Sequence, residues 1–275
     1  MIDLHTHTTA SDGRCTPAIL VARAAAAGVT TLSVTDHDTV GAAEAAAAAC
    51  EAAGLAFVPG IEITAVSNGV DIHVLGYWLD FRSPSLYAFL AEQRYRRIER
   101  LREIIARLAR FGIQLDADAL VQPALDDPAK SAGRPWIARA LVAAGHVAST
   151  GVAFDKWLSR GQPAFVPRLA APPEDVFAQI HAAGGVASIA HPGLLRRDEW
   201  IARFANAGLD ALEAYHPEHD AAATARYVEL ARRYGLRVSG GSDFHGDESH
   251  GAPQPGTVSL PQEAYDRLRQ ATQGT

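Results

Sequence analysis

The chain has 275 residues, of which 48% are apolar and 20% charged, and its formal net charge is −6. This composition is typical of a globular protein and excludes a disordered chain, while the negative charge offers no general attraction for a long polyanion. We therefore expect no DNA duplex partner, although a local cationic cluster can still hold a small anion. The two cysteines, Cys15 and Cys50, form no CxxC motif and predict neither a disulfide framework nor a cysteine metal site.

The first residues, MIDLHT, lack the basic start of a signal peptide, and charged residues interrupt the alanine-rich runs. We therefore expect a cytoplasmic protein without a membrane-spanning segment.

The first 79 residues alternate between strand-like and helix-like patterns. Strands rich in β-branched and aromatic residues are expected in TLSVTD (31–36), LAFVPGIEIT (55–64) and DIHVLGYWL (71–79). Helices are expected between the first three strands, at 16–28 and 40–54. Thr16 is the expected N-cap of the first helix, Pro17 lies in its first turn and Gly28 ends it.

After Leu79 the strand-like patterns stop. Apolar residues recur at helical spacing along a segment that predicts a long helix at 84–111. Shorter helices are expected at 116–125, 134–145 and 150–159. We interpret residues 83–167 as an inserted helical domain that covers the substrate site, and residues 1–82 with 168–275 as the main domain.

From Pro172 the alternation resumes and runs to a terminal helix at 261–271. Strands are expected in VASIAHP, ALEAYHP, RVSGGSDFHG and GTVSL (256–260). Repeated strand–helix units imply a parallel sheet with right-handed crossovers, and around seven of them favour a closed α/β barrel. An open doubly wound sheet is the alternative, although no GxGxxG motif follows the first strand.

Polar side chains gather at the ends of the expected strands. The opening stretch MIDLHTHTTASDG places His5 and His7 on one face of the first strand. Other strands end in imidazoles and carboxylates that would meet at the mouth of a barrel: Asp36, His37, Asp38, Glu62, His73, His191, Glu213, His216, Asp243 and His245. Burying such a cluster costs free energy unless a bound metal compensates the charges and polar groups. Imidazole and carboxylate ligands suit zinc, manganese or iron.

Several of the polar residues have an ordinary structural explanation instead. Asp36 and Asp38 are candidate N-caps of the following helix. We expect His146, His181 and His250 to be ordinary hydrogen-bonded histidines, and His219 to be exposed beside two acidic residues.

The motifs HTHTTASDG, TDHDT, PGIE, AHP and GSDFHG resemble the motif series of the PHP (polymerase and histidinol phosphatase) phosphoesterase superfamily over nearly the whole chain. The resemblance implies a distorted (β/α)7 barrel with an inserted small helical domain and a centre of three divalent metals. The implied ligands are His5, His7, Glu62 and Asp243 for one metal, Glu62, His73 and His191 for a second, and Asp12, His37 and His245 for the third. Some members carry a histidine at the position of Asp12, and the carboxylate favours manganese or iron over zinc.

The segments SAGRPWIARALVAAGHVAS and AFDKWLSRGQPAFVPR are similar to one bacterial branch of the superfamily. Members of that branch remove phosphate from 3′,5′-nucleoside bisphosphates, and related members trim short RNA from its 5′ end. The resemblance implies a metal-dependent phosphatase that removes the 3′-phosphate from a bisphosphate such as pAp. A metal-activated hydroxide held by Glu62 would attack phosphorus directly, without a covalent intermediate. His216 is either a proton donor, a phosphate contact or a core histidine.

Substrate contacts are expected from the helical insertion. Lys130 and Arg134 lie at a glycine-containing turn before a helix, where backbone N–H groups and the helix dipole favour phosphate. At 100° per residue, Arg97 and Arg102 both flank the apolar side of the long helix, and Arg102 is our weaker candidate for substrate binding. Solvated surface charge is the alternative for these residues.

Three other functions stay open. The chain could be a 5′-to-3′ exoribonuclease acting on short 5′-phosphorylated RNA, or a non-catalytic PHP module that binds metal or a partner. Amidohydrolase chemistry is a weaker alternative, because those barrels often use a carbamylated lysine and no lysine ends a strand here.

Overall fold

The computed structural model describes residues 1–246 and 252–273. Within them, a curled seven-stranded sheet forms in chain order: β1 (Ile2–Asp3), β2 (Thr31–Val34), β3 (Ala56–Ser67), β4 (Val70–Tyr77), β5 (Val186–Ile189), β6 (Ala211–Tyr215) and β7 (Arg237–Gly240). The two edges of the sheet approach each other, because the Leu4 N–H donates to the Gly240 carbonyl at 3.2 Å and Thr6 forms a parallel bridge with Phe244. The expected α/β fold is therefore present.

Strand β4 departs from the expected parallel sheet, since it runs antiparallel to both β3 and β5. Only Asn68 and Gly69 separate β3 from β4, and both have positive φ angles of 50° and 71°. This is the backbone conformation of a two-residue hairpin turn, and a parallel connection would need a much longer crossover. The prediction was wrong here because it did not use the Asn-Gly turn signal.

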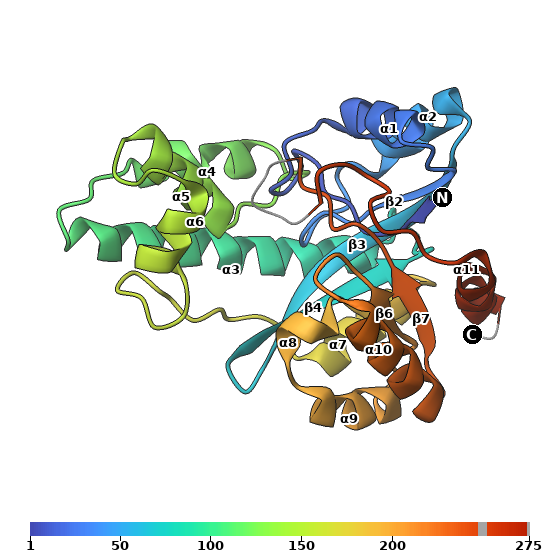
Figure 1. Cartoon of the computed structure of the whole chain (residues 1–275). Helices are drawn as coiled ribbons and strands as arrows, with labels where there is room; N and C mark the ends of the chain where they lie inside the picture. The colour runs from blue at the N-terminus through green and yellow to red at the C-terminus, as the bar shows by residue number, and fades with distance from the viewer. Residues whose placement is uncertain (247–251, 274–275) are drawn as a thin grey trace.

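Helices α1 (Pro17–Ala26) and α2 (Ala43–Ala53) pack beside each other and cover the β1–β3 end of the sheet (Figure 1). Helix α1 begins as predicted, because the Thr16 side chain accepts a hydrogen bond from the Ile19 N–H and Pro17 occupies the first turn. Gly28 follows its end and Gly54 ends α2, both with positive φ angles.

The second half of the chain covers the other part of the sheet with α7 (Pro173–Ala182), α8 (Pro192–Leu195), η2 (Asp198–Trp200), α9 (Ile201–Asn206) and α10 (Ala221–Arg233). Phe177 and Phe204 are fully buried there, with ring centroids 5.9 Å apart, in the largest part of the core. Helix α11 (Gln262–Arg269) packs against β7 and continues into η3 (Gln270–Gln273).

The segment GTVSL (256–260) is not a strand, although we predicted one. Gly256 has a φ of 77° and its N–H donates to the Asp3 carboxylate at 2.7 Å, so the backbone turns there. The Ile2 N–H donates to the Ser259 hydroxyl at 2.9 Å and the Leu260 N–H to the Ile2 carbonyl at 2.9 Å. The segment therefore lies beside β1 without extending the sheet.

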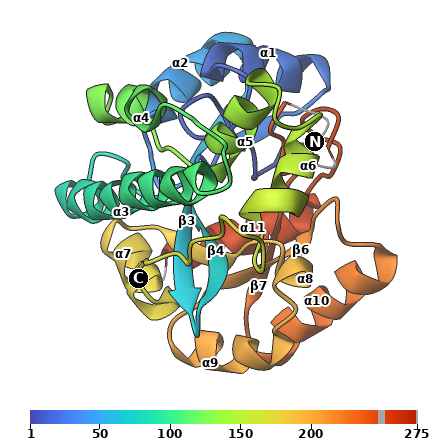
Figure 2. The same cartoon turned by 90° about the vertical axis from the view of Figure 1, so that its left-hand side faces the viewer.

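The helices of the middle segment lie to one side of the sheet (Figures 1 and 2). They are α3 (Pro84–Ala109), α4 (Ala117–Asp126), α5 (Arg134–Ala143), α6 (Thr150–Ala153) and the π-helical turn η1 (Phe154–Leu158). Ile98, Leu101 and Leu141 belong to a hydrophobic cluster formed within this segment. Leu86 and Leu90, at the start of α3, instead pack into the core of the sheet. The division into domains at residues 83 and 167 stays a prediction.

Among the described residues, no helix combines the length and the apolar composition that crossing a membrane requires.

Candidate metal centre and active site

His5 and His7 lie just after β1, and both are fully buried. Their ring centroids are 5.2 Å apart. Neighbouring backbone segments approach them closely. A Cβ atom at Gly241 would lie 2.3 Å from the backbone nitrogen of His5, and one at Gly13 would lie 2.5 Å from the carbonyl oxygen of His7. Glycine at these two positions therefore lets neighbouring segments pack directly against the two histidines.

Glu62 lies at the centre of the site. It is a buried residue of β3, and its two carboxylate oxygens contact imidazole nitrogens from four other segments of the chain. Oε2 lies 3.3 Å from His5 Nε2, 3.2 Å from His7 Nε2 and 3.1 Å from His37 Nδ1, and Oε1 lies 2.7 Å from His73 Nδ1 and 3.3 Å from His191 Nε2. Burial opposes ionisation of Glu62, yet the neighbouring imidazoles outweigh it and hold its pKa well below the usual range.

Asp243 follows β7 and faces the same point. Its Oδ1 lies 3.2 Å from His5 Nε2 and 3.1 Å from His7 Nε2. Asp243 has a φ of 51° and His191 has a φ of 28°, a left-handed backbone conformation that is unfavourable for residues with a Cβ atom. Such strain persists where the surrounding structure enforces it, and it is concentrated at functional sites.

Asp12 forms a third group with three imidazoles. One carboxylate oxygen lies 3.4 Å from His245 Nε2 and 3.7 Å from His7 Nδ1, and the other lies 3.6 Å from His37 Nε2. The ligand atoms of these four residues all lie within 4.8 Å of one another. The imidazoles of His37 and His245 outweigh burial and lower the pKa of Asp12 well below its usual range.

The structure thus brings all nine predicted metal-ligand side chains into one contiguous cluster. Within the described residues, the groups able to share a metal are His7, Asp12, His37 and His245; His5, His7 and Asp243; His37, Glu62 and His73; and His5, Glu213 and His216. His7 belongs to two groups, whereas the resemblance assigned it to one. The assignment of each residue to a particular metal stays a prediction.

The residues fit divalent metals by two criteria. Both ring nitrogens of His7, His37 Nδ1 and His73 Nδ1 are buried, and although carboxylate oxygens lie near them, none of these contacts among the described residues has the geometry of a hydrogen bond. Unpartnered buried nitrogens are costly, and metal ligation satisfies them. The donor set of imidazoles and carboxylates is also the one that manganese, iron and zinc accept.

Asp36 supports the loop between His7 and Asp12, and it does not cap a helix as its sequence position suggested. Its carboxylate accepts hydrogen bonds from the Thr8 N–H at 2.8 Å and from the Thr8 and Ser11 hydroxyls at 2.6 Å each. Helix α2 begins further along the chain, after Ala42, without a side-chain cap. Sequence reasoning missed this role because the partners of Asp36 come from a different segment.

Asp38 is also not a helix cap. Its carboxylate forms buried ion pairs with Arg97 and with Arg168, the second at 3.6 Å, and accepts the Thr64 N–H at 2.9 Å. Arg168 was not among the predicted site residues. No local sequence signal links it to Asp38, because the two residues lie 130 positions apart.

Glu213 is another residue whose role the sequence did not define. One of its oxygens lies 2.9 Å from His5 Nδ1 and the other accepts the His191 N–H at 2.7 Å. Burial opposes protonation of His5, but Glu213, Asp243 and Glu62 outweigh it and raise the pKa of His5 well above its usual value.

His216 is buried, and its Nε2 lies 3.4 Å from Asp243 Oδ2. Its Nδ1 accepts the Glu218 N–H at 3.2 Å, so in the neutral ring the proton is on Nε2, which faces Asp243. His219 is buried rather than exposed as predicted, because Nδ1 donates to the Ala214 carbonyl at 3.0 Å and Nε2 accepts the Gly193 N–H at 3.1 Å. His250 lies outside the described residues.

The predicted substrate residues occupy different places. Lys130 lies next to Ser131, whose N–H donates to the Ala10 carbonyl at 2.8 Å, so it is close to the loop that carries Asp12. Arg134 begins α5, donates to the Leu158 carbonyl at 3.2 Å and lies 4.0 Å from Asp71. The Arg102 side chain is 40% exposed and forms ion pairs with Glu99 at 2.9 Å and with Asp118 at 3.6 Å. Its guanidinium group is therefore engaged in ion pairs at the surface of α3 and α4.

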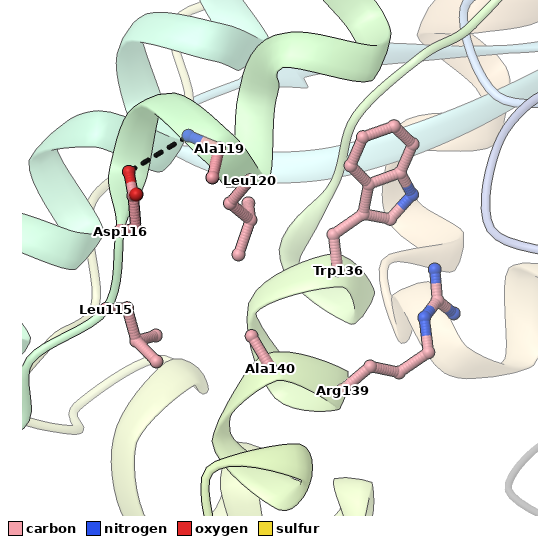
Figure 3. Close-up of a pocket in the computed structure, with 7 residues that line it drawn as sticks. All are labelled: Leu115, Asp116, Ala119, Leu120, Trp136, Arg139 and Ala140. Carbon is pink, nitrogen blue, oxygen red and sulfur yellow. Dashed lines mark hydrogen bonds between the residues drawn. The ribbon is translucent and has the colours of Figure 1, made fainter.

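Helix α5 also contacts the loop that carries Asp12. The Trp136 indole N–H donates to the Ser11 carbonyl at 2.9 Å, and the Arg139 guanidinium donates to the Asp12 carbonyl at 3.2 Å. The same two side chains line a pocket of about 430 Å³ with Leu115, Asp116, Ala119, Leu120 and Ala140 (Figure 3). The helical segment is therefore connected directly to the candidate metal centre.

Comparison with known proteins identifies the family of the chain. The family model "PHP domain" matches residues 3–119. The chain is 38% identical over 252 residues to the 5′-3′ exoribonuclease Rnm of Salmonella typhimurium, covering 88% of this chain and 84% of the relative. It is 36% identical over 267 residues to the 3′,5′-nucleoside bisphosphate phosphatase of Chromobacterium violaceum, covering 94% of this chain and 92% of the relative.

Solved structures show the same fold. A structure from Bifidobacterium adolescentis, described as a metal-dependent phosphoesterase, superposes with a TM-score of 0.88 at 31% identity, covering 98% of this chain and 95% of the other. One from Chromobacterium violaceum, described as an amidohydrolase with bound sulfate and no metal, has a TM-score of 0.86 at 34% identity, covering 98% and 96%. The similarities extend over nearly the whole chain, and the protein therefore belongs to the PHP family of metal-dependent phosphoesterases.

Proposed function

We propose that the protein is a metal-dependent phosphatase that hydrolyses the 3′-phosphate of 3′,5′-nucleoside bisphosphates such as pAp. The observation that carries the proposal is the Glu62 carboxylate, which contacts five imidazoles. Two of these, His5 and His7, also contact Asp243, and His7 and His37 contact Asp12. The bisphosphate phosphatase of Chromobacterium violaceum shares 36% of its residues and aligns with 94% of this chain.

The cluster would hold three divalent ions, with manganese as the first candidate and iron or zinc as alternatives. His5, His7, Glu62 and Asp243 would hold one, Glu62, His73 and His191 a second, and Asp12, His37 and His245 the third. Bound metals supply charge neutralisation at the phosphoryl oxygens and lower the pKa of water to near neutrality.

The protein's own side chains orient the reacting groups. Glu62 uses both oxygens in the cluster and would position the attacking water. His216 would present its Nε2 proton to the substrate phosphate or to the leaving oxygen, since that atom faces Asp243. We propose direct hydrolysis, because the Thr8 and Ser11 hydroxyls donate to Asp36, and Cys15 and Cys50 lie in hydrophobic clusters.

A 5′-to-3′ exoribonuclease is the second candidate function, favoured by the 38% identical relative and by the pocket beside Trp136, which is large enough for a further base. A non-catalytic module is disfavoured because each of the nine ligand positions keeps an imidazole or a carboxylate. Amidohydrolase chemistry with a lysine bridge is disfavoured because both lysines, Lys130 and Lys156, lie in the helical segment.

The test is a comparison of rates on the manganese-loaded protein. Phosphate release from pAp would be measured against nucleotide release from short 5′-phosphorylated RNA, at equal concentrations of 5′ ends. The proposal expects the higher kcat/KM on pAp. A higher kcat/KM on the oligonucleotides would show that the exoribonuclease is the correct function. If neither substrate were hydrolysed, the non-catalytic module would be the remaining interpretation.

A further inference from the structure

Four arginines from the helical segment and the chain that follows it surround two carboxylates next to the metal centre. Arg97 and Arg168 both contact Asp38, and Arg168 and Arg134 lie 3.4 and 4.0 Å from Asp71. Arg100 lies close enough to Arg168, Arg134 and Asp71 to interact with all three electrostatically. We name Arg97, Arg100, Arg134 and Arg168 the arginine cluster.

The arginine cluster contains more positive than negative charge, and most of that charge is buried. Four guanidinium groups face two carboxylates, while Arg97 and Arg100 are each only 7% exposed and the Arg168 side chain only 9%. Burial and the neighbouring arginines lower the pKa of Arg100 to about 9 and that of Arg168 to about 10, although Asp71 partly opposes both changes. A buried excess of cationic charge is unfavourable unless an anion joins it.

Four buried polar atoms in or beside the cluster have no hydrogen-bond partner among the described residues: Arg100 Nη2, Arg168 Nε, Ser131 Oγ and Thr64 Oγ1. Ser131 precedes Gly133, where a Cβ atom would lie 3.2 Å from Arg97 Nη2. The Thr64 N–H donates to the Asp38 carboxylate that pairs with Arg97. These atoms are donors that an anion would satisfy together with the guanidinium groups.

The arginine cluster directly adjoins the candidate metal centre. Asp38 follows His37 in sequence, and Asp71 lies two residues before His73, on the same face of β4. His73 is also the cross-strand partner of Thr64. The two places are therefore adjacent, so that a substrate with two anionic groups would have one at the metal ligands and the other at the arginines.

We propose that the arginine cluster is a second anion site, which binds the phosphate group of the substrate that is not hydrolysed. This inference rests on the proposed function and adds the residues that select a substrate with two phosphates. Guanidinium groups bind phosphate oxygens through paired N–H donors, and a phosphate dianion would balance the excess of two positive charges. The two phosphates of the substrate would then be held by different chemistry, one by metals and one by arginines.

The test measures anion binding to protein freed of metal with a chelator. Sulfate would be titrated calorimetrically into the wild type and into Arg100→Gln, at constant ionic strength set with chloride. We expect saturable binding to the wild type and affinity reduced by about tenfold or more in Arg100→Gln, which loses charge-assisted hydrogen bonds. The matched control is Arg96→Gln on the same helix, whose partner is the exposed Glu92, and it should bind sulfate as the wild type does.

A second variant keeps the test valid if Arg100→Gln does not fold. Arg168→Lys preserves the charge but removes the paired N–H donors, and it should weaken sulfate binding by a smaller factor. In the metal-loaded protein, either variant should lower the ratio of kcat/KM for pAp to kcat/KM for p-nitrophenyl phosphate, which has only one phosphate.

Absence of saturable sulfate binding to the wild type, or equal affinity in Arg96→Gln, Arg100→Gln and Arg168→Lys, would overturn the anion site. Because sulfate binding needs neither metal nor turnover, it is independent of whether pAp is the substrate. A protein that binds sulfate through these arginines but does not hydrolyse pAp would refute the proposed function alone.

Discussion

The Nδ1 atom of His5 lies 2.9 Å from Oε1 of Glu213, while the other oxygen of Glu213 accepts the backbone N–H of His191. One carboxylate outside the predicted ligand set thus fixes the ring of one predicted ligand and the backbone of another. We predict that Glu213→Gln lowers metal affinity or activity by about 10- to 100-fold, as is typical when the carboxylate behind a ligating histidine is replaced.

Metal content after dialysis against graded chelator would measure the effect of Glu213→Gln. Glu218→Gln, at an exposed position five residues along the chain, is the matched control. Unchanged metal retention in Glu213→Gln would show that His5 is oriented without this carboxylate.

Glu62→Ala should have a larger effect than any other single substitution in the cluster. It removes the carboxylate that contacts five imidazoles from four other segments. We expect less than the full complement of bound metal by elemental analysis and at least about a 100-fold loss of phosphatase activity. Glu44→Ala, which removes an exposed pair with Arg82, is the control. Full metal content in Glu62→Ala would contradict the central position given to this residue.

Asp12→His should change which metal the protein prefers. Asp12 contacts the imidazoles of His7, His37 and His245, so the substitution would leave the group with nitrogen donors only. Imidazole suits zinc better than manganese, and we expect the ratio of bound zinc to manganese to rise in competition experiments. Asp116→His, at the N-cap of α4, is a control outside the cluster. An unchanged ratio would exclude this carboxylate as a determinant of metal choice.

We predict that His181, which is not part of the metal-ligand cluster, makes a pH-dependent contribution to stability. Its Nε2 lies 2.7 Å from Asp210 Oδ2, and this hydrogen bond raises the pKa of His181 above its unfolded value near 6.5 although burial opposes the change. A raised folded pKa means that the stabilisation is fully present below about pH 6.5 and is lost as the pH rises through the folded pKa.

The free energy of unfolding of His181→Gln should therefore be below that of the wild type at about pH 6, by less than about 1 kcal/mol because the pair is partly exposed. The difference should vanish at about pH 9. Denaturant titrations at both pH values measure it. A difference that increases with pH would mean that the neutral form of His181 is the stabilising one.

The sequence predicted the regions that depend on local signals. Thr16, Pro17 and Gly28 act within one turn of α1, so their effect can be read without knowing the rest of the fold. The nine ligand positions could be listed because each lies in or beside a motif that resembles the PHP motif series. The antiparallel direction of β4 was also predictable, since Asn68 and Gly69 are a strong hairpin signal.

The residues that were misjudged depend on distant partners. Asp38 looked like a helix cap because Arg97 and Arg168 are 59 and 130 positions away. Arg97 and Arg102 both flank the apolar side of α3, so helical periodicity alone could not distinguish them. The packing of Leu86 and Leu90 into the sheet core fixes the position of α3, which buries Arg97 and leaves Arg102 at the surface.

The β3–β4 hairpin carries side chains of both the metal centre and the arginine cluster: Glu62 and Thr64 on one strand, Asp71 and His73 on the other. A shift of β4 against β3 by one residue would turn Asp71 and His73 to the face of the sheet opposite Glu62 and Thr64. The distance between Asp71 and His73 is fixed by the strand itself, at about 7 Å for two residues. If both sites bind phosphate, the spacing between the two phosphates of the preferred substrate is encoded in this hairpin. Mutations on the helices that carry the arginines would then alter affinity, whereas a change of substrate length would require a change in the register or twist of β3 and β4.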